Sequence, residues 1–281
     1  MIRRCSMGWC GVITGVIVLA ATCGLEAQVW LDYNQVTGSN IVADPLLGTN
    51  DPEEKDYTAA DFDLDGDIDL VVARKLPFTT FGNRPNVLFM NVDGVMIDQT
   101  ATYAPEFISS VDFPDGDNSR DVMVANIDGD AWPDVVFANA GNQGSPGQQP
   151  RLYINLGEDT SGNWLGFEDQ SFRMPYLLVG GQQPNACAVG IGDVTGNGLD
   201  DIYIVDYNNS LEDKLLINDG TGNFTEETNS RLPAGFENSG FATAGVIADM
   251  NGDGYGDIVK DTTPSIRIAY NDGASNPGVF S

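Results

Sequence analysis

The chain has 281 residues, enough for one large domain or two small ones, and 42% of them are hydrophobic, so a packed core is expected and general disorder is excluded. It carries 41 Asp and Glu against 13 Lys and Arg and no His, for a formal net charge of -28. Such a surface repels nucleic acid and anionic membranes, and without His the chain cannot build a Ser-His-Asp triad, a Cys-His pair or a His-ligated zinc site.

The N-terminus has the pattern of a secretory signal. Arg3 and Arg4 form a short positive region, an apolar stretch covers residues 7–25, and polarity returns before Gln28. This order predicts a signal peptide over residues 1–27 with cleavage near its end. A retained membrane anchor is the alternative, since 19 apolar residues are just enough to span a bilayer. We expect a secreted or cell-surface protein, periplasmic if the source is bacterial, with no membrane span after cleavage.

Cysteine usage supports the same division of the chain. Cys5, Cys10 and Cys23 lie in the predicted signal, and the mature chain keeps Cys187 alone, so it has no internal disulfide. An exported protein without disulfides needs another source of stability. Metal ions are the obvious candidate.

One acidic nine-residue pattern recurs four times along the rest of the chain, at residues 61–69, 126–134, 193–201 and 249–257. The first residues of successive copies are 65, 67 and 56 positions apart, and each copy leads directly into a β-branched apolar run. About 25 residues further on, a second strand-like run ends each time in Asn, before a Gly-rich turn and an aromatic segment. These Asn residues are Asn91, Asn155, Asn218 and Asn271.

Each repeat therefore holds roughly four short strands separated by turn residues. No segment has helical periodicity over a useful length. Four strands with this period predict an all-β fold, a β-propeller of four-stranded blades over residues 28–281. A β-sandwich is the alternative, because turns favour Asp, Asn and Gly without any ligand. Four copies at near-even spacing favour the propeller.

Oxygen-bearing side chains occupy positions 1, 3, 5 and 9 of each acidic loop. Calcium prefers roughly six to eight hard oxygens and tolerates irregular geometry, and alternate residues of a tight loop can turn their oxygens to one centre. Position 7 varies in type, which suits a ligand that binds through its backbone carbonyl. The predicted calcium ligands are Asp61, Asp63, Asp65, Asp67, Asp69, Asn126, Asp128, Asp130, Trp132, Asp134, Asp193, Thr195, Asn197, Leu199, Asp201, Asp249, Asn251, Asp253, Tyr255 and Asp257.

An EF-hand is the competing interpretation, because its loop also begins D-x-D-x-D-G. That loop needs a bidentate Glu at position 12 and flanking helices, whereas Val72, Phe137, Ile204 and Lys260 stand there in this chain. The sequence thus predicts up to four calcium ions in loops between strands, tightest in the first loop and weakest in the third by carboxylate number. Solvated turns without metal are the other alternative, although clustered carboxylates repel unless a cation offsets them.

The acidic loop, the hydrophobic strand after it, the strand ending in Asn and the Gly turn before Phe together resemble the FG-GAP/VCBS repeats. These repeats form the integrin α-subunit propeller and occur in many bacterial secreted proteins. The resemblance covers about residues 29–281, and it implies calcium in the loops and a role in adhesion or ligand binding. The chain departs from the pattern at Asn126, Thr195 and Asn197, and the Phe-Gly and Gly-Ala-Pro signatures are not clear.

The number of blades has two interpretations. Most such propellers have seven blades, and this chain supplies four loops. Gly278–Ser281 aligns with the start of the last strand of the third repeat, Gly222–Thr225, and Val29–Tyr33 resembles the same outer strand. Either this N-terminal strand completes the final blade and closes a small ring, or the chain is a fragment of a longer, seven-bladed propeller. We favour the fragment, because four-bladed closure with this repeat would be unusual.

An adhesion or ligand-binding module is the favoured function, with a protein or glycan ligand at the cell surface and no enzymatic activity. One alternative is a polysaccharide lyase or hydrolase with paired carboxylates, but the loops account for nearly all the patterned acids. The other is a lectin-like sugar binder, with Trp30, Trp132 and Trp164 as stacking candidates, although Trp more often packs in a core. We expect partner contacts at residues 139–150 and 177–185, which are long connections.

Overall fold

The computed structural model describes residues 16–19, 28–31, 41–42, 54–76, 82–108, 116–141, 147–178, 181–208 and 212–281. The chain divides into two compact units, residues 1–41 and 42–281. In the first unit, β1 (Val16–Leu19) pairs antiparallel with β2 (Gln28–Leu31). Apart from β1, the predicted signal peptide lies outside the described residues. Within the described ranges, no helix is both long and apolar enough to cross a membrane.

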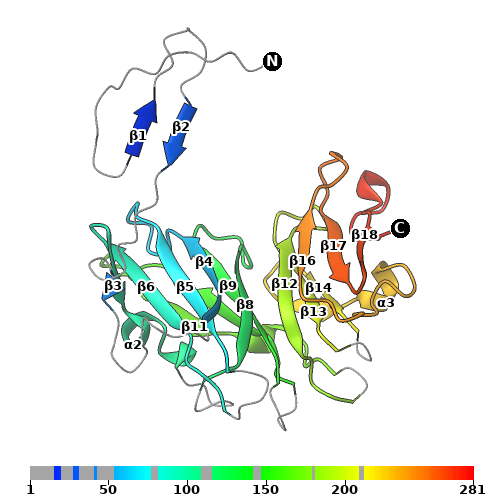
Figure 1. Ribbon diagram of the computed structural model, residues 1–281, viewed down its shortest axis with the longest axis horizontal. Helices are drawn as coiled ribbons and strands as arrows, with labels where there is room; N and C mark the ends of the chain where they lie inside the picture. The colour runs from blue at the N-terminus through cyan, green and yellow to red at the C-terminus, as the bar shows by residue number, and fades with distance from the viewer. Residues whose placement is uncertain are drawn as a thin grey trace. The chain divides into compact units, whose positions relative to one another are not determined.

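The described part of the second unit is built from four antiparallel sheets, the blades (Figure 1). The first blade contains β4 (Glu54–Ala60), β5 (Asp69–Arg74), β6 (Val87–Val92) and β7 (Val95–Asp98), with the two-residue β3 (Ile41–Val42) next to β7. The second contains β8 (Ser119–Ala125), β9 (Asp134–Asn139), β10 (Arg151–Asn155) and β11 (Phe167–Asp169). The third contains β12 (Ala186–Gly192), β13 (Asp201–Asp206), β14 (Lys214–Asn218) and β15 (Phe224–Glu226). The fourth contains β16 (Gly245–Ala248), β17 (Asp257–Thr262) and β18 (Ser265–Ala269).

The outer edge of the fourth blade is formed by the last residues of the chain. Asn271 and Phe280 make an isolated bridge there, and Tyr270 and Ser281 exchange two backbone hydrogen bonds. In the third blade Asn218 pairs with Phe224 in the same way. The alignment of Gly278–Ser281 with the start of the third repeat's last strand is therefore confirmed. Val29, which the ring-closing alternative assigns to that outer strand, instead pairs with Val18 of β1.

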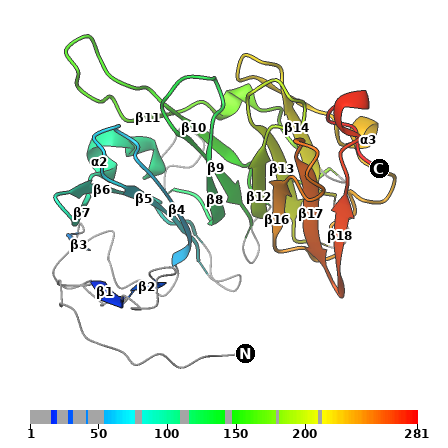
Figure 2. The same ribbon diagram turned by 90° about the horizontal axis from the view of Figure 1, so that it is seen from above.

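The first strands of the blades lie side by side in chain order, β4 next to β8, β8 next to β12 and β12 next to β16 (Figure 2). Each later strand of a blade lies one step further out from this row. Successive sheets thus pack face to face with their first strands innermost, which is how propeller blades pack. The predicted all-β propeller of four-stranded blades is confirmed.

Among the described residues, three hydrophobic cores lie between the blades rather than within one sheet. Val136 and Leu152 of the second blade pack in one cluster with Ile202 and Leu216 of the third. Because side chains alternate across a strand, Tyr203 of the third blade turns the other way, into the cluster shared with the fourth. A strand covered on both faces needs apolar residues at consecutive positions, which explains the continuous runs in β9 and β13.

One-turn helices lie in the connections after the outer strands of the first three blades and, in the fourth blade, between β18 and the outer edge. They are α2 (Thr100–Tyr103), η1 (Pro105–Phe107), η2 (Ser171–Arg173), α3 (Thr228–Arg231) and η3 (Gly273–Ser275). Three of them begin with a buried or half-buried hydroxyl that accepts a backbone N–H from the third strand: Thr100 from Leu88, Ser171 from Leu152 and Thr228 from Leu215. These hydroxyls fix where each connection leaves its blade.

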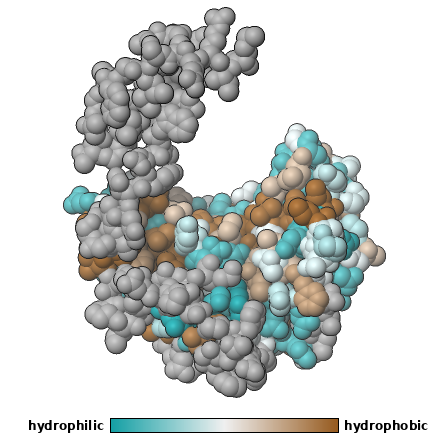
Figure 3. Space-filling model, in the orientation of Figure 1, coloured by the Kyte–Doolittle hydropathy of each residue, from teal (hydrophilic) through white to brown (hydrophobic). Residues whose placement is uncertain are grey.

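The fourth blade carries apolar side chains on its exposed face. Figure 3 shows hydrophobic residues gathered over β16–β18. Ile268 is 38% exposed, whereas Leu215, at the matching position of the third blade, is fully buried beneath the fourth. The exposed face therefore has the chemistry of the faces that are covered between blades.

Candidate functional site

The four acidic loops each connect the first strand of a blade to the second. They follow β4, β8, β12 and β16, which run parallel to one another in the row of innermost strands. Equivalent connections of neighbouring blades lie at the same end of their sheets. All four loops are therefore at one end of the propeller unit.

The side chain at position 5 has the same role in every loop. Asp65, Asp130, Asn197 and Asp253 each accept the backbone N–H of the residue two positions on, at 2.7–2.9 Å. This bond orients the peptide of position 7, whose carbonyl is a predicted ligand. The position-7 residues are Asp67, Trp132, Leu199 and Tyr255.

The side chain at position 1 folds back over the glycine turn. Asp193 accepts N–H groups from Gly196 and Gly198, both at 2.7 Å, and Asp249 accepts them from the equivalent glycines. Gly196 and Gly198 have φ of 77° and 88°, a region in which a side chain would be strained. The glycines therefore allow the turn that brings positions 1, 3 and 5 together.

The first loop gathers the most negative charge. Carboxylate oxygens of Asp61, Asp63 and Asp65 lie within 4.8 Å of one another. The Oδ1 atom of Asp61 is buried and accepts no hydrogen bond from the described residues. Burial, followed by the neighbouring charge of Asp65, raises the pKa of Asp63. In the other loops Asn126, Thr195, Asn197 and Asn251 replace one or two of these carboxylates.

The Asp at position 9 is buried in every loop and holds two segments together. One oxygen accepts the N–H of position 2 and the other accepts the N–H of the recurring Asn at or near the end of the third strand. Burial raises the pKa of Asp69 and Asp201 to about 6 and that of Asp134 to about 7. Each oxygen keeps a second lone pair, so the predicted metal role of these residues is compatible with the bridging role.

The Asn residues link each loop to the next blade, a role that the sequence did not indicate. The side-chain amides of Asn155, Asn218 and Asn271 donate to the position-2 carbonyls of Phe62, Ile127 and Val194 in the preceding blade, each at 2.8 Å. The same amides donate to position 8 of their own loops. Their regular recurrence was visible in the sequence, but the partner, some 77–93 residues away, was not.

Residues 193–259 match the family model of the FG-GAP-like repeat. The match begins at the first residue of the third acidic loop and ends inside β17, so it contains two of the four loops. The chain carries an FG-GAP-like repeat. No curated protein matches the chain.

The FG-GAP-like chain is also similar to a solved structure described as the basis of specific recognition of non-reducing terminal N-acetylglucosamine by an Agrocybe aegerita lectin. The two are 22% identical, with a TM-score of 0.48, and the match covers 79% of this chain and 50% of the other. The present chain thus spans about half the length of that lectin.

A second acidic group of the FG-GAP-like chain lies along the innermost strands. Asp56, Asp121 and Arg120 line a hollow of about 310 Å³ together with the thiol-bearing Cys187. Asp121 accepts the N–H of Val189 at 2.9 Å, and burial raises its pKa to about 6. The sequence did not single out this acid pair, because its members come from different blades and follow no motif.

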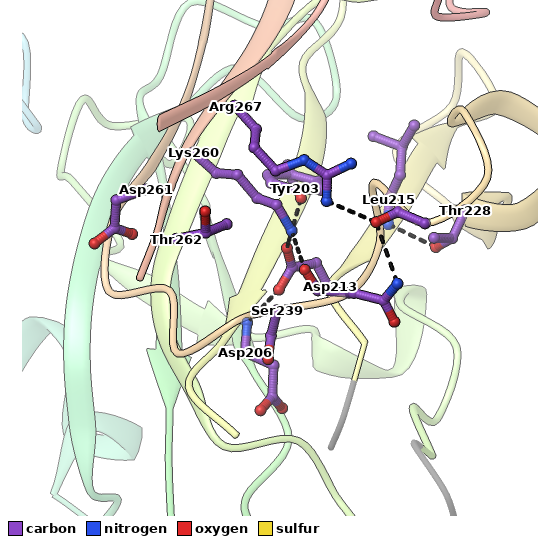
Figure 4. A network of polar contacts seen from close by, with 12 residues as sticks. Tyr203, Asp206, Asp213, Leu215, Thr228, Ser239, Lys260, Asp261, Thr262 and Arg267 are labelled. Atoms are coloured by element: carbon purple, nitrogen blue, oxygen red, sulfur yellow. Dashed lines mark hydrogen bonds and ion pairs between the residues drawn. The ribbon is translucent and has the colours of Figure 1, made fainter. Parts of the chain in front are cut away.

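A buried ion pair joins the third and fourth blades (Figure 4). The ammonium of Lys260 contacts the Asp213 carboxylate and donates to the carbonyl of Asn238 at 2.7 Å. The hydroxyl of Tyr203 donates to the same carboxylate at 2.7 Å. Burial raises the pKa of Asp213 and lowers that of Lys260. These groups bind one another, so we interpret the network as one that positions the two blades.

The described tryptophans pack rather than form a sugar platform. The Trp164 ring lies 4.8 Å from that of Tyr103, and its indole N–H donates to Asn155 at 2.8 Å. Trp132 lies under Gly157, where an added Cβ would come within 2.7 Å of the indole nitrogen. The side chain of Trp30 lies outside the described residues.

Proposed function

We propose that this chain is a secreted β-propeller that binds a protein or glycan at the cell surface and holds calcium in its four acidic loops as a structural ion. The observation that carries the calcium proposal is the convergence of Asp61, Asp63 and Asp65 around a buried carboxylate oxygen without a hydrogen-bond donor. A buried anionic oxygen is costly unless a donor or a cation compensates it. The FG-GAP-like match supports a propeller module as the setting.

The donor set of the first loop fits calcium better than magnesium. It offers several carboxylates and a backbone carbonyl from a flexible turn, whereas magnesium requires near-ideal octahedral geometry and keeps several waters. Carboxylates, amides and a hydroxyl fill the matching positions of the other loops, so the same ion suits all four. Asp61, Asp63 and Asp65 would hold the ion through side chains and Asp67 through its carbonyl.

The ligand-binding role is proposed on the faces of the propeller unit. Loops supported by rigid sheets carry binding sites more often than strands do. The signal-like N-terminus and the single cysteine of the mature chain support export. An exported chain stabilised by calcium rather than disulfides accounts for both the acidic loops and the cysteine usage.

Isothermal titration of the chain from Gln28 onward with calcium tests the metal proposal. We expect up to four sites, the tightest in the first loop, because affinity rises with ligand charge. Asp63→Asn should remove or weaken the tightest site. Asp93→Asn is the matched control, since Asp93 is exposed in the turn after β6 and has a φ of 54° that Asn tolerates. A stoichiometry of zero for the unsubstituted chain would refute the calcium proposal.

A further inference from the structure

A cavity of about 420 Å³ lies on the second blade, away from the acidic loops. Gln149 and Pro150 line it from the connection between β9 and β10, and Phe172, Tyr176 and Gln183 line it from the connection between β11 and β12. Because β9 runs from the acidic loop to the first of these connections, the cavity is at the opposite end of the strands. Ligand cavities in proteins are typically about 300–1,000 Å³.

The two connections hold each other in place. The amide of Gln149 accepts the N–H of Leu177 at 2.8 Å and donates to its carbonyl at 2.9 Å. Gly147 lies so close to the other connection that an added Cβ would be 2.0 Å from the carbonyl oxygen of Pro184. These are the two long connections predicted to host a partner, and the structure brings them together. A cavity with fixed walls loses little conformational entropy when a ligand binds.

Two aromatic rings that line the cavity are exposed to solvent. Phe172 is 80% exposed and Tyr176 is 67% exposed, although Met174 and Leu177 beside them are buried. Phe172 is presented by η2, whose first residue Ser171 donates its backbone N–H to Asp169 at 2.9 Å. The buried neighbours and the hydrogen bond from Ser171 to Asp169 fix the backbone under both rings. Exposed rings on a fixed backbone offer flat apolar faces to a ligand.

The polar groups of the cavity carry little net charge. Arg151 is compensated by Asp117 and Asp169, at 3.5 and 3.4 Å, and no carboxylate is among the described lining residues. The amide nitrogen of Gln183 donates to no described residue, so it can donate to a ligand. Neither a cation nor an anion finds an uncompensated opposite charge here, and the net charge of -28 further disfavours anions.

We infer that this cavity binds a neutral saccharide, an inference that rests on the proposed ligand-binding role and names its site and ligand class. A neutral pyranose has apolar C–H faces that can pack on Phe172 and Tyr176. Its hydroxyls can hydrogen-bond to the Gln183 amide and the Tyr176 hydroxyl. Charged sugars and cationic ligands lack a matching charge in the cavity, and a purely apolar ligand would leave the Gln183 amide without a partner.

The test uses the chain from Gln28 onward with cellobiose, maltose and lactose, and with digalacturonic acid and a decaproline peptide as competing ligand classes. Saturation-transfer NMR detects binding and calorimetry measures Kd. We expect saturable binding of at least one neutral disaccharide, weakened about tenfold or more by Phe172→Ala and by Tyr176→Ala. Tyr57→Ala is the matched control, because Tyr57 is 70% exposed on β4, outside the cavity, and should leave Kd unchanged.

Absence of binding to all three disaccharides would overturn the inference, and so would binding that neither cavity variant changes. Binding of digalacturonic acid or decaproline that Phe172→Ala abolishes would assign the cavity to another ligand class. Circular dichroism confirms folding, which is expected because both rings are exposed. Melting in calcium and in chelator, measured on the same samples, separates this result from the metal proposal, since the cavity and the acidic loops are at opposite ends of the strands.

Discussion

The recurring Asn at or near the end of the third strand forms two sets of hydrogen bonds through one side chain. In Asn218 the amide nitrogen binds the carbonyls of Ile127 and Asp200, while the carbonyl oxygen accepts N–H groups from Gly220 and Gly222. Its backbone N–H also binds Asp201 at position 9 of the acidic loop. One residue thus connects a loop, a turn and the preceding blade.

Asn218→Ala should destabilise the protein by about 1–3 kcal/mol, because it leaves the buried carbonyl of Ile127 without a donor. Denaturant unfolding monitored by fluorescence measures the change in midpoint. Asn229→Ala is the matched control, since Asn229 is exposed on α3. Equal midpoints for the two variants would show that the inter-blade bond contributes nothing.

The buried ion pair gives a second prediction at this scale. Lys260→Met should cost about 3–5 kcal/mol, because it leaves the Asp213 carboxylate buried without its cation. Adding Asp213→Asn to Lys260→Met should restore part of the loss, because the remaining group is neutral. If the double variant loses more unfolding free energy than the two single variants lose in sum, the pair does not act as a unit.

Strands and loops could be predicted from the sequence to different degrees. The runs at 151–155 and 214–218 are β10 and β14, since alternation and flanking turns define a buried strand from local residues alone. The last such run, expected to end at Asn271, ends as β18 at Ala269, and Asn271 pairs with Phe280 in an isolated bridge. Such pairing depends on tertiary contacts that periodicity does not contain.

The positions of the acidic loops could be predicted, but the bridging role of their last Asp could not. The spacing identifies oxygen-bearing residues, whereas the partner N–H of Asn155 comes from a different strand than the loop of Asp134. The one-turn helices were also absent from the prediction, because a single turn is too short for helical periodicity.

The loops predict how stability depends on pH. Burial raises the pKa of Asp134 to about 7 and that of Asp69 and Asp201 to about 6, above the values of an unfolded chain. As pH rises, the unfolded state therefore loses these protons before the folded state does. The contribution of these three Asp residues to the free energy of unfolding is complete below about pH 4 and is lost as pH rises through 6–7. In chelator the melting temperature should fall between about pH 4.5 and 7.5. Calcium should reduce or reverse this fall, and a rise in chelator would contradict the burial argument.

At the scale of the whole molecule, the repeat period determined the blade architecture, because four strands per repeat bury both faces only when the repeats stack. The sequence also identified the two connections that meet at the cavity. It could not show that they meet, nor that Phe172 and Tyr176 lie beside them, since these residues belong to the segment after β11, which has no recurring pattern. The two connections could therefore be located from the sequence, and the cavity could not.

Net charge links the loops to the stability of the whole chain. Acidic residues outnumber basic ones 41 to 13, so like-charge repulsion opposes the folded state most strongly where carboxylates are confined. An ion that binds the folded loop and not the unfolded chain stabilises by mass action, about 2.7 kcal/mol per site at a 100-fold excess over Kd. Several occupied sites would supply much of a typical domain stability of about 5–15 kcal/mol.

Differential scanning calorimetry of the chain from Gln28 onward, in millimolar calcium and in chelator at constant ionic strength, tests this account most directly. The account predicts a melting temperature that is higher by several degrees in calcium, with the increase reduced by Asp63→Asn and retained in Asp93→Asn. Equal melting temperatures in the two buffers would contradict it, and the four loops would then be solvated turns.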